Sequence, residues 1–198
     1  MDVGIFGGTF DPPHIGHLII AQEALEQARL DCVVFIPAMV PPHKRDARVS
    51  PFPLRLAMVH AATSTNPRFS VSDIEATLPP PSFTVDTLRA LRRAEPEWRD
   101  LHLIIGSDSL LELPTWRMPE EVLRMARLVV YPRAVPGATD PSPAYAAGAL
   151  FLDASHLPVS SSLVRQRVRS GRSARYWLPD SVWDLVVSRR LYLSEEGS

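Results

Sequence analysis

Short apolar runs alternate along this chain with segments that have helical spacing. Runs of strand length lie at residues 2–6, 32–37, 101–105, 127–131 and 149–152, and helical spacing predicts helices at 18–29, 53–64, 84–94, 119–126, 160–170 and 180–190. Strands that alternate with helices are typical of parallel sheets, because each parallel connection needs a crossover. The pattern predicts an α/β fold that is Rossmann-like and doubly wound, with a mostly parallel sheet and helices on both faces.

The segment 18–29 shows the clearest amphipathic pattern. Leu18, Ala21, Leu25 and Ala28 fall on one stripe, while acidic and amide side chains fall elsewhere. A crossover helix that covers a sheet has such a stripe. Ligands of doubly wound folds bind at the carboxyl ends of the strands, so we expect a site where the first strand ends.

Length and charge limit the classes of protein to consider. A chain of 198 residues has the size of one globular domain, so we expect a single domain over 1–198 with a helical C-terminal portion from about 160. The formal net charge of −1 gives no broad positive field, and we expect no nucleic acid partner. The N-terminus lacks the features of a secretory signal, and no apolar run approaches the ~18 residues of a membrane span. We expect a cytoplasmic enzyme.

Cysteine and lysine each occur only once in the chain. Cys32 is the only cysteine and lies in an apolar run, which indicates a small buried side chain and excludes a disulfide framework or a cysteine zinc site. Lys44 is the only lysine among many arginines. Lys44, which ends the segment Pro-Pro-His-Lys, is therefore a candidate for a specific role.

The strongest chemical signal is the segment 7–17, GGTFDPPHIGH, which runs from the first apolar run into a helix. Gly7 and Gly8 lack Cβ atoms, so a phosphate can approach the main-chain N–H groups. His14 and His17 lie three apart at the start of the helix, and both rings can reach the same anion. Donors placed in this way can neutralise the charge that develops on a phosphorus atom during in-line substitution.

Other interpretations of this segment fit less well. An ordinary strand-to-helix turn does not explain two histidines at fixed offsets. The segment contains neither the Gly-x-Gly-x-x-Gly spacing of a dinucleotide site nor the Gly-Lys-Ser/Thr of a Walker loop. Histidines three apart could bind zinc, but no third ligand is evident.

A second candidate lies near the C-terminus. Ser160 is suited to cap the predicted helix, and Ser161, Ser162 and Arg165 lie on or near its first turn, where they could meet triphosphate oxygens. Taken alone, the segment could equally be a plain capped helix with a basic face.

Together the two segments resemble a known family. Residues 7–17 resemble the His-x-Gly-His signature of the nucleotidyltransferase superfamily, in the form found in bacterial nicotinate mononucleotide adenylyltransferases. Residues 159–165 resemble that family's Ile-Ser-Ser-Thr-x-Ile-Arg, with conservative departures at 159, 162 and 164. The resemblance implies the HIGH-type nucleotidyltransferase fold.

Three intermediate segments resemble the same family in order. The loop with Lys44 corresponds to a phosphate contact of the family. Residues 82–88 correspond to a turn that binds the nicotinate nucleotide, with Phe83 in place of tyrosine. Residues 105–110 and Trp116 correspond to an element that binds the ATP ribose and the pyridine ring, with Ser107 in place of alanine. By this resemblance, His14 and His17 are catalytic; ATP and its phosphates contact Gly7, Gly8, Thr9, Phe10, Lys44, Gly106, Asp108, Ser160, Ser161, Ser162 and Arg165; the nicotinate nucleotide contacts Ser82, Thr84, Ser107 and Trp116.

The implied reaction transfers AMP from ATP to nicotinate mononucleotide, giving deamido-NAD and pyrophosphate in NAD biosynthesis. Mg²⁺ would bridge triphosphate oxygens through water and substrate, without a protein metal site. Nicotinamide mononucleotide and phosphopantetheine remain alternative acceptors. A nucleotide-binding regulator that has lost the chemistry is an alternative from another class.

Overall fold

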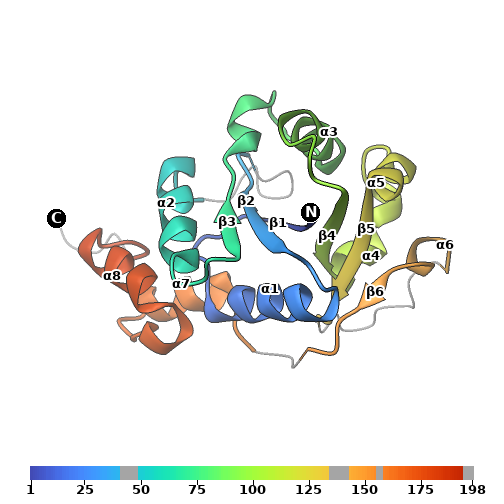
Figure 1. Cartoon of the computed structure of the whole chain (residues 1–198). Coiled ribbons are helices and arrows are strands. Elements are labelled where there is room, and N and C mark those ends of the chain that lie inside the picture. Colours follow the sequence, from blue (N-terminus) through green and yellow to red (C-terminus); the bar gives the residue numbers. More distant parts are fainter. Residues whose placement is uncertain (41–48, 134–142, 155–157, 194–198) are drawn as a thin grey trace.

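One parallel sheet organises the described part of the chain (Figure 1). The computed structural model describes residues 1–40, 49–133, 143–154 and 158–193. The strands are β1 Asp2–Gly8, β2 Cys32–Pro37, β3 Phe69–Val71, β4 Asp100–Gly106, β5 Ala126–Tyr131 and β6 Leu150–Phe151. They lie in the order β3-β2-β1-β4-β5-β6, and each neighbouring pair is parallel. The predicted doubly wound α/β fold is confirmed.

Helices connect these strands and cover both faces of the sheet. Their bounds are α1 Ile15–Gln27, α2 Phe52–Thr63, α3 Thr84–Ala94, α4 Ser107–Glu112, α5 Pro119–Met125, α6 Pro143–Ala146, α7 Ser161–Arg169 and α8 Asp180–Ser188, with short 3-10 turns at Ile74–Thr77, Leu113–Thr115 and Arg175–Trp177. Figure 1 shows α3 and α5 on one side of the sheet and α1 on the other. This arrangement requires apolar side chains on both sides of every central strand.

Successive side chains of a strand serve different cores. Val3 and Ile5 of β1 pack in one apolar cluster with α3 and α5, while Phe6 packs in a second cluster with α1. The stripe predicted on α1 is present in a shifted form: Ala21, Ala24 and Leu25 are buried, and Leu18 and Ala28 are half-buried. Alternate strand residues therefore hold the two helical layers against the sheet.

The C-terminal helices form a third apolar cluster with α2. Val164 and Val168 of α7 and Val182 and Val186 of α8 pack there against Met58 of α2. The predicted helical portion from about 160 therefore lies beside α2, next to the loop that follows β1. That both portions make one domain stays a prediction.

The sheet opens between β1 and β4. Pairing of β1 with β2 continues to Gly8 opposite Pro37, but pairing of β1 with β4 ends at Ile5 opposite Leu103. On the other side, β4 pairs with β5 as far as Gly106 opposite Tyr131. The chain reverses its direction of winding at this pair of strands, so a crevice forms at their carboxyl ends.

Some elements differ from the prediction. β3, α4 and α6 were not predicted, because an edge strand of three residues and helices of six and four residues are too short to show a period. The strand predicted at 149–152 covers Leu150–Phe151 only. In the part of the chain that is described, no helix has the length and apolar character needed to cross a membrane.

Candidate active site

A cavity of about 920 Å³ occupies the crevice between β1 and β4. The loop after β1 and the N-terminal ends of several helices complete its walls. Most of the predicted site residues line it: Gly7, Gly8, Thr9, Phe10, His14, His17, Ser82, Thr84, Gly106, Asp108, Trp116, Ser160, Ser161 and Ser162. Ser107 and Arg165 are not part of this lining, and Lys44 lies outside the described residues.

The end of β1 presents its backbone to the cavity. A Cβ atom added at Gly7 would meet no atom within 4 Å, so the space beside this backbone is open to a ligand. A Cβ atom at Gly8 would lie 2.9 Å from the ring of Phe10, so any side chain there would force this buried ring to move. Phe10 itself has a φ of 48°, a left-handed conformation that turns the chain sharply after the strand. The glycines thus permit both the approach of a ligand and the sharp turn.

The two histidines stack at the start of α1. His14 is the residue before the first helical turn, and its ring lies 3.7 Å from that of His17, centroid to centroid. The His14 N–H donates to Nδ1 of His17 at 3.1 Å, so the neutral ring of His17 carries its proton on Nε2. Nδ1 of His14 is buried and has no protein partner among the described residues. A Cβ atom at Gly16 would approach this nitrogen to 3.0 Å, which explains the glycine between the histidines.

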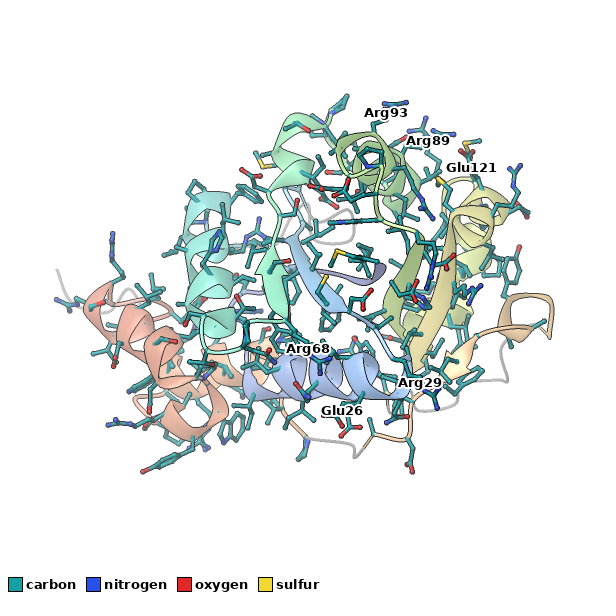
Figure 2. All side chains as sticks on the ribbon, viewed as in Figure 1. Glu26, Arg29, Arg68, Arg89, Arg93 and Glu121 are labelled. Carbon is teal, nitrogen blue, oxygen red and sulfur yellow. The ribbon has the colours of Figure 1, made fainter. Side chains whose placement is uncertain are left out.

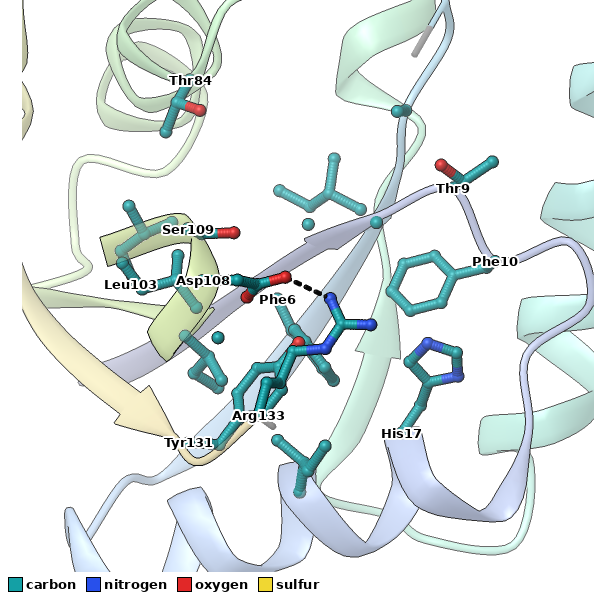
Figure 3. Close-up of a pocket in the computed structure, with 18 of the residues that line it drawn as sticks. Phe6, Thr9, Phe10, His17, Thr84, Leu103, Asp108, Ser109, Tyr131 and Arg133 are labelled. Carbon is teal, nitrogen blue, oxygen red and sulfur yellow. Dashed lines mark hydrogen bonds and ion pairs between the residues drawn. The ribbon is translucent and has the colours of Figure 1, made fainter. Parts of the chain in front are cut away.

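Aromatic side chains hold the orientation of His17. The ring of Phe10 packs edge-on against the imidazole at 5.0 Å, and Phe6 lies at 6.1 Å. Figure 3 shows the imidazole beside Phe10 at the margin of the cavity. Because the backbone engages Nδ1, the Nε2–H group, which bonds to none of the described residues, is left to bind a ligand.

Both histidines are neutral near pH 7. Burial, with a smaller contribution from the positive charge of Arg133, lowers the pKa of His14 to about 4. The pKa of His17 is also well below its ordinary value, because the cavity walls remove water from the ring and His14 and Arg133 lie near. The site thus offers hydrogen-bond donors that carry no charge of their own before an anion arrives.

A buried arginine links the loop after β1 to two other segments. Arg55 of α2 is 1% exposed and donates to the carbonyls of Thr9 at 2.8 Å, Met39 at 3.2 Å and Ser50 at 2.9 Å. One guanidinium therefore joins the loop after β1 to the segments on either side of residues 41–48. Its planar set of donors suits it to hold three carbonyls at once.

A carboxylate in the same loop is held from the C-terminal end. Asp11 is 2% exposed; its Oδ1 accepts from the hydroxyl of Tyr192 at 2.7 Å, and its Oδ2 accepts from the Ser50 N–H at 3.1 Å. Burial and the Asp11 carboxylate raise the pKa of Tyr192, so its hydroxyl stays protonated and donates. The last described segment of the chain thus helps to fix the loop that precedes the histidines.

Helix α7 holds two further carbonyls of this loop. The Ser161 hydroxyl donates to the Pro12 carbonyl at 2.8 Å, and Arg165 Nη1 donates to the Asp11 carbonyl at 2.6 Å. Arg165 Nη2 also donates to the Ser162 hydroxyl at 3.3 Å. Ser160 accepts from the Leu163 N–H, which confirms its predicted role as helix cap. The second signature therefore contacts the first directly.

The ends of β4 and β5 carry a charged pair over the cavity. Arg133 Nη1 lies 2.7 Å from Asp108 Oδ2, while Asp108 Oδ1 is buried and has no partner in the described part of the chain. Figure 3 shows the guanidinium projecting between Asp108 on one side and Phe10 and His17 on the other. The Ser107 hydroxyl bonds to the backbone N–H of Arg133 at 2.9 Å and to its carbonyl at 3.2 Å, so this side chain joins the two strand ends.

The opposite wall is formed by α3 and the segment around Trp116. Ser82 is 6% exposed and its Oγ has no partner in the described structure, although it lines the cavity. Phe83 precedes the first turn of α3, and no described side chain caps this helix. Trp116 lines the cavity and packs against the first apolar cluster. This wall thus combines unpaired donors with a flat aromatic surface.

A metal site built from protein side chains is not found among the described residues, where no group of three or more His, Cys, Asp or Glu is suitably placed. Glu75 lines the cavity, but its oxygens accept from the Met39 N–H and the Thr87 hydroxyl. Asp108 is engaged with Arg133.

Comparison with known proteins places this site in a family. The cytidylyltransferase-like family model matches residues 5–167. A probable nicotinate-nucleotide adenylyltransferase of Exiguobacterium sibiricum is 44% identical over 192 residues, covering 97% of this chain and 99% of the relative. One from Trichlorobacter lovleyi is 42% identical over 212 residues, covering 97% and 99%. The chain belongs to the nicotinate-nucleotide adenylyltransferase family. The family predicted from the two signatures is confirmed.

Solved structures agree with this adenylyltransferase fold. The Plasmodium falciparum nicotinic acid mononucleotide adenylyltransferase complexed with APC superposes with a TM-score of 0.76 at 15% identity, covering 96% of each chain. The same Plasmodium protein complexed with NaAD gives a TM-score of 0.77 at 16% identity and covers 96% of this chain and 97% of that one. At this identity the likeness concerns the fold.

Sequence reasoning missed several residues of this adenylyltransferase site. Arg133 comes two residues after the predicted strand 127–131, so the rule that ligands bind beyond strand ends could have found it. Arg55 and Tyr192 carried no such signal, because their partners are backbone or carboxylate groups distant in sequence.

The depressed pKa of His14 predicts a dependence of stability on pH. The unfolded chain binds a proton on His14 near its ordinary pKa of 6.5, whereas the folded protein does so near 4. Acid therefore favours unfolding between these values, and at about pH 5 the cost is about 2 kcal/mol relative to about pH 7.5. In His14→Gln, the loss of unfolding free energy between these pH values should be smaller by about that amount, measured by urea unfolding.

His60→Gln is the matched control, because it removes an exposed histidine from α2. Equal pH dependence in His14→Gln and the wild-type protein would contradict the assignment.

The hydrogen bond between Tyr192 and Asp11 predicts that the C-terminal segment stabilises the histidine loop. Tyr192→Phe should lower the free energy of unfolding by about 1–3 kcal/mol, because it removes a donor to a buried carboxylate. Tyr176→Phe makes the same change at a side chain that is 86% exposed and should have little effect. Denaturant unfolding of the two variants measures the difference, and equal stability would exclude this contribution.

Proposed function

We propose that this adenylyltransferase transfers AMP from ATP to nicotinate mononucleotide and releases pyrophosphate. The observation that carries the proposal is the position of His17, whose Nε2–H group is left free at a cavity bordered by the glycine loop and the N-terminus of α7. The ligands of the Plasmodium relatives, APC and NaAD, are consistent with an adenine nucleotide and a dinucleotide product.

The reaction needs alignment more than proton transfer. An oxygen of the 5′-phosphate of nicotinate mononucleotide bonds to the α-phosphorus of ATP, the bond from that phosphorus to the bridging oxygen breaks, and pyrophosphate leaves with the electron pair. The attacking oxygen is already ionised near neutral pH, so no general base is required. The protein's contribution is to hold two anionic substrates in line and to stabilise the added charge.

His17 stabilises the charge that develops on the α-phosphate. Its Nε2–H donates to a phosphate oxygen, and the backbone bond at Nδ1 keeps the ring in that orientation. An anion at Nε2 raises the pKa of this ring from its depressed value, which strengthens the hydrogen bond. His14 also lines the cavity, and its buried Nδ1 has no partner among the described residues. We infer that this ring binds a neighbouring phosphate oxygen.

ATP lies along the crevice between β1 and β4 in this proposal. The open backbone at Gly7, the first turn of α7 and Arg133 meet the phosphates. A ribose hydroxyl supplies the partner that Asp108 Oδ1 lacks. Lys44 belongs to the loop outside the described residues, and its phosphate contact stays a prediction.

Ser161 and Arg165, predicted to contact the triphosphate, are already bonded to other groups of the protein. Both side chains hold carbonyls of the histidine loop, and Arg165 is absent from the cavity lining. We infer that they act on ATP chiefly by fixing this loop, while the α7 backbone faces the phosphates.

The nicotinate nucleotide occupies the wall formed by α3 and Trp116. Ser82 and the free N–H groups at the start of α3 bind polar groups of the nucleotide, and the indole stacks on the pyridine ring. The Ser107 hydroxyl is bonded to the backbone of Arg133. We therefore infer that Ser107 contacts the nicotinate nucleotide through its own backbone.

Mg²⁺ accompanies ATP in this proposal. We infer that triphosphate oxygens and water would hold this ion, because Mg²⁺ prefers oxygen ligands and keeps several waters. When bound, Mg²⁺ would supply positive charge against the leaving pyrophosphate. A cytoplasmic location stays a prediction from the sequence.

Pyrophosphate release tests this function against its alternatives. The protein is supplied with ATP and Mg²⁺ and, in parallel, nicotinate mononucleotide, nicotinamide mononucleotide or phosphopantetheine. We expect strong preference for nicotinate mononucleotide. Preference for another acceptor would keep the histidine chemistry but change the substrate, and silence with all three would favour a binding protein without catalysis.

His17→Ala should lower kcat by at least ~100-fold, because a single donor to a transition-state oxyanion contributes roughly this much. The fold should remain intact, as judged by far-ultraviolet circular dichroism. His60→Ala is the control for loss of a histidine on the exposed face of α2. Wild-type turnover in His17→Ala would exclude this mechanism.

A further inference from the structure

Two arginines are found in the cavity lining of the described residues, and they lie at different walls. Arg133 projects beside the histidines, where the proposed function places phosphates. Arg117 follows Trp116 and lies against the start of α3. The phosphate chemistry described above uses Arg133 but leaves Arg117 without a role.

Contacts with α3 hold Arg117 at the aromatic wall. Its guanidinium carbon lies 5.0 Å above the ring centroid of Phe83, and Nη1 lies 3.2 Å from Asp86 Oδ2. The side chain is 51% exposed, so part of the guanidinium remains free for a ligand. A planar cation stacked on an aromatic ring keeps its edge donors available.

Asp86 does not depend on Arg117 alone. Its other oxygen, Oδ1, accepts from Arg89 at 3.1 Å, and Arg89 also pairs with Glu121 at 2.6 Å. Figure 2 shows Arg89 on the outer side of α3 with Glu121 on the neighbouring helix α5. Arg117 can therefore turn toward an anion in the cavity while the Asp86 carboxylate keeps a positive partner.

Other donors at the same wall are unpaired. The Ser82 hydroxyl is buried and lacks a partner in the described structure, and α3, a helix of 11 residues, begins without a side-chain cap. Helix N-termini favour anions through their free N–H groups and partial positive charge. The guanidinium of Arg117 adds a full positive charge to this group of donors.

We propose that Arg117 is a specificity-determining residue that favours the carboxylate of nicotinate mononucleotide over the amide of nicotinamide mononucleotide. The inference rests on the proposed function, which places the pyridine ring at Trp116. The two acceptors share ribose and phosphate and differ by one negative charge on the ring. Only the acid gains a charge-assisted hydrogen bond from the guanidinium, whereas the amide presents a neutral oxygen and donors that the cation repels.

Solvent limits the size of the effect. Because half of the Arg117 side chain is exposed, water and salt screen the attraction. We expect the guanidinium to contribute about fivefold to the ratio of kcat/KM for acid over amide. The ratio should also fall as the salt concentration rises.

The test measures kcat/KM for both acceptors in the full chain and two charge-neutralising variants. Arg117→Gln should lower the acid-to-amide ratio about fivefold, with the loss confined to the acid and expressed mainly in its KM. Arg93→Gln removes the same charge from an exposed position of α3 outside the cavity lining and should leave the ratio unchanged. Arg117→Lys keeps the charge and should restore most of the ratio.

Each outcome separates this inference from the proposed function. A wild-type enzyme that prefers nicotinate mononucleotide, together with an unchanged ratio in Arg117→Gln, overturns the role of Arg117 and leaves the function standing. Equal losses with acid and amide also overturn it, because they assign Arg117 to the shared phosphate. A wild-type protein that uses neither acceptor overturns the function and this inference with it.

Discussion

The loop between β1 and α1 must hold a fixed shape without regular secondary structure of its own. Its two prolines donate no backbone hydrogen bonds, and the turn at Phe10 is left-handed. Side chains from three other parts of the chain therefore bind its polar groups: Arg55 from α2, Ser161 and Arg165 from α7, and Tyr192 from the C-terminal segment. The positions of both histidines depend on these bonds, because α1 begins where the loop ends. The C-terminal helices pack against α2 beside the loop, although Ser161 and Tyr192 follow their loop partners by 149 and 181 residues.

The opening of the sheet supplies the space that this loop borders. β1 and β4 separate after Ile5 and Leu103, while each remains paired with its outer neighbour. Backbone and helix N-termini then face a cavity rather than another strand, and the unpaired atoms of His14, Ser82 and Asp108 all occur in residues that line it. Buried polar atoms without partners are costly, so their gathering at one cavity is best explained by a polar ligand.

Electrostatics divides this cavity into two parts. Near the histidines, burial and Arg133 keep the imidazoles neutral until an anion arrives. At the aromatic wall, Arg117 lies among carboxylates and arginines that balance one another, with Asp86 shared between two cations. A negative ligand can replace Asp86 as the partner of Arg117 without leaving a charge unpaired. Phosphate chemistry and ring recognition thus use separate cations placed by separate elements.

Much of this could be predicted from local sequence. Alternating apolar runs determined the doubly wound sheet, because strand and helix periods follow from backbone geometry. The glycines, the histidine pair and the cap at Ser160 could be recognised because their chemistry depends on neighbours within a few residues. Ser82, Thr84 and Trp116 were found only through resemblance to the family, as their own segments were ambiguous.

Only the tertiary structure decided which distant groups the polar side chains of the site bind. It placed the Ser161 hydroxyl and the Arg165 guanidinium on loop carbonyls, attached Ser107 to the backbone of Arg133, and buried Arg55 among three carbonyls. Side chains of this kind have several possible partners in a sequence, and only the folded chain brings one of them within hydrogen-bond distance. The sequence by itself determined which chemistry the chain carries and which segments form the four central strands; packing determined which polar groups are already satisfied and which are left for substrates.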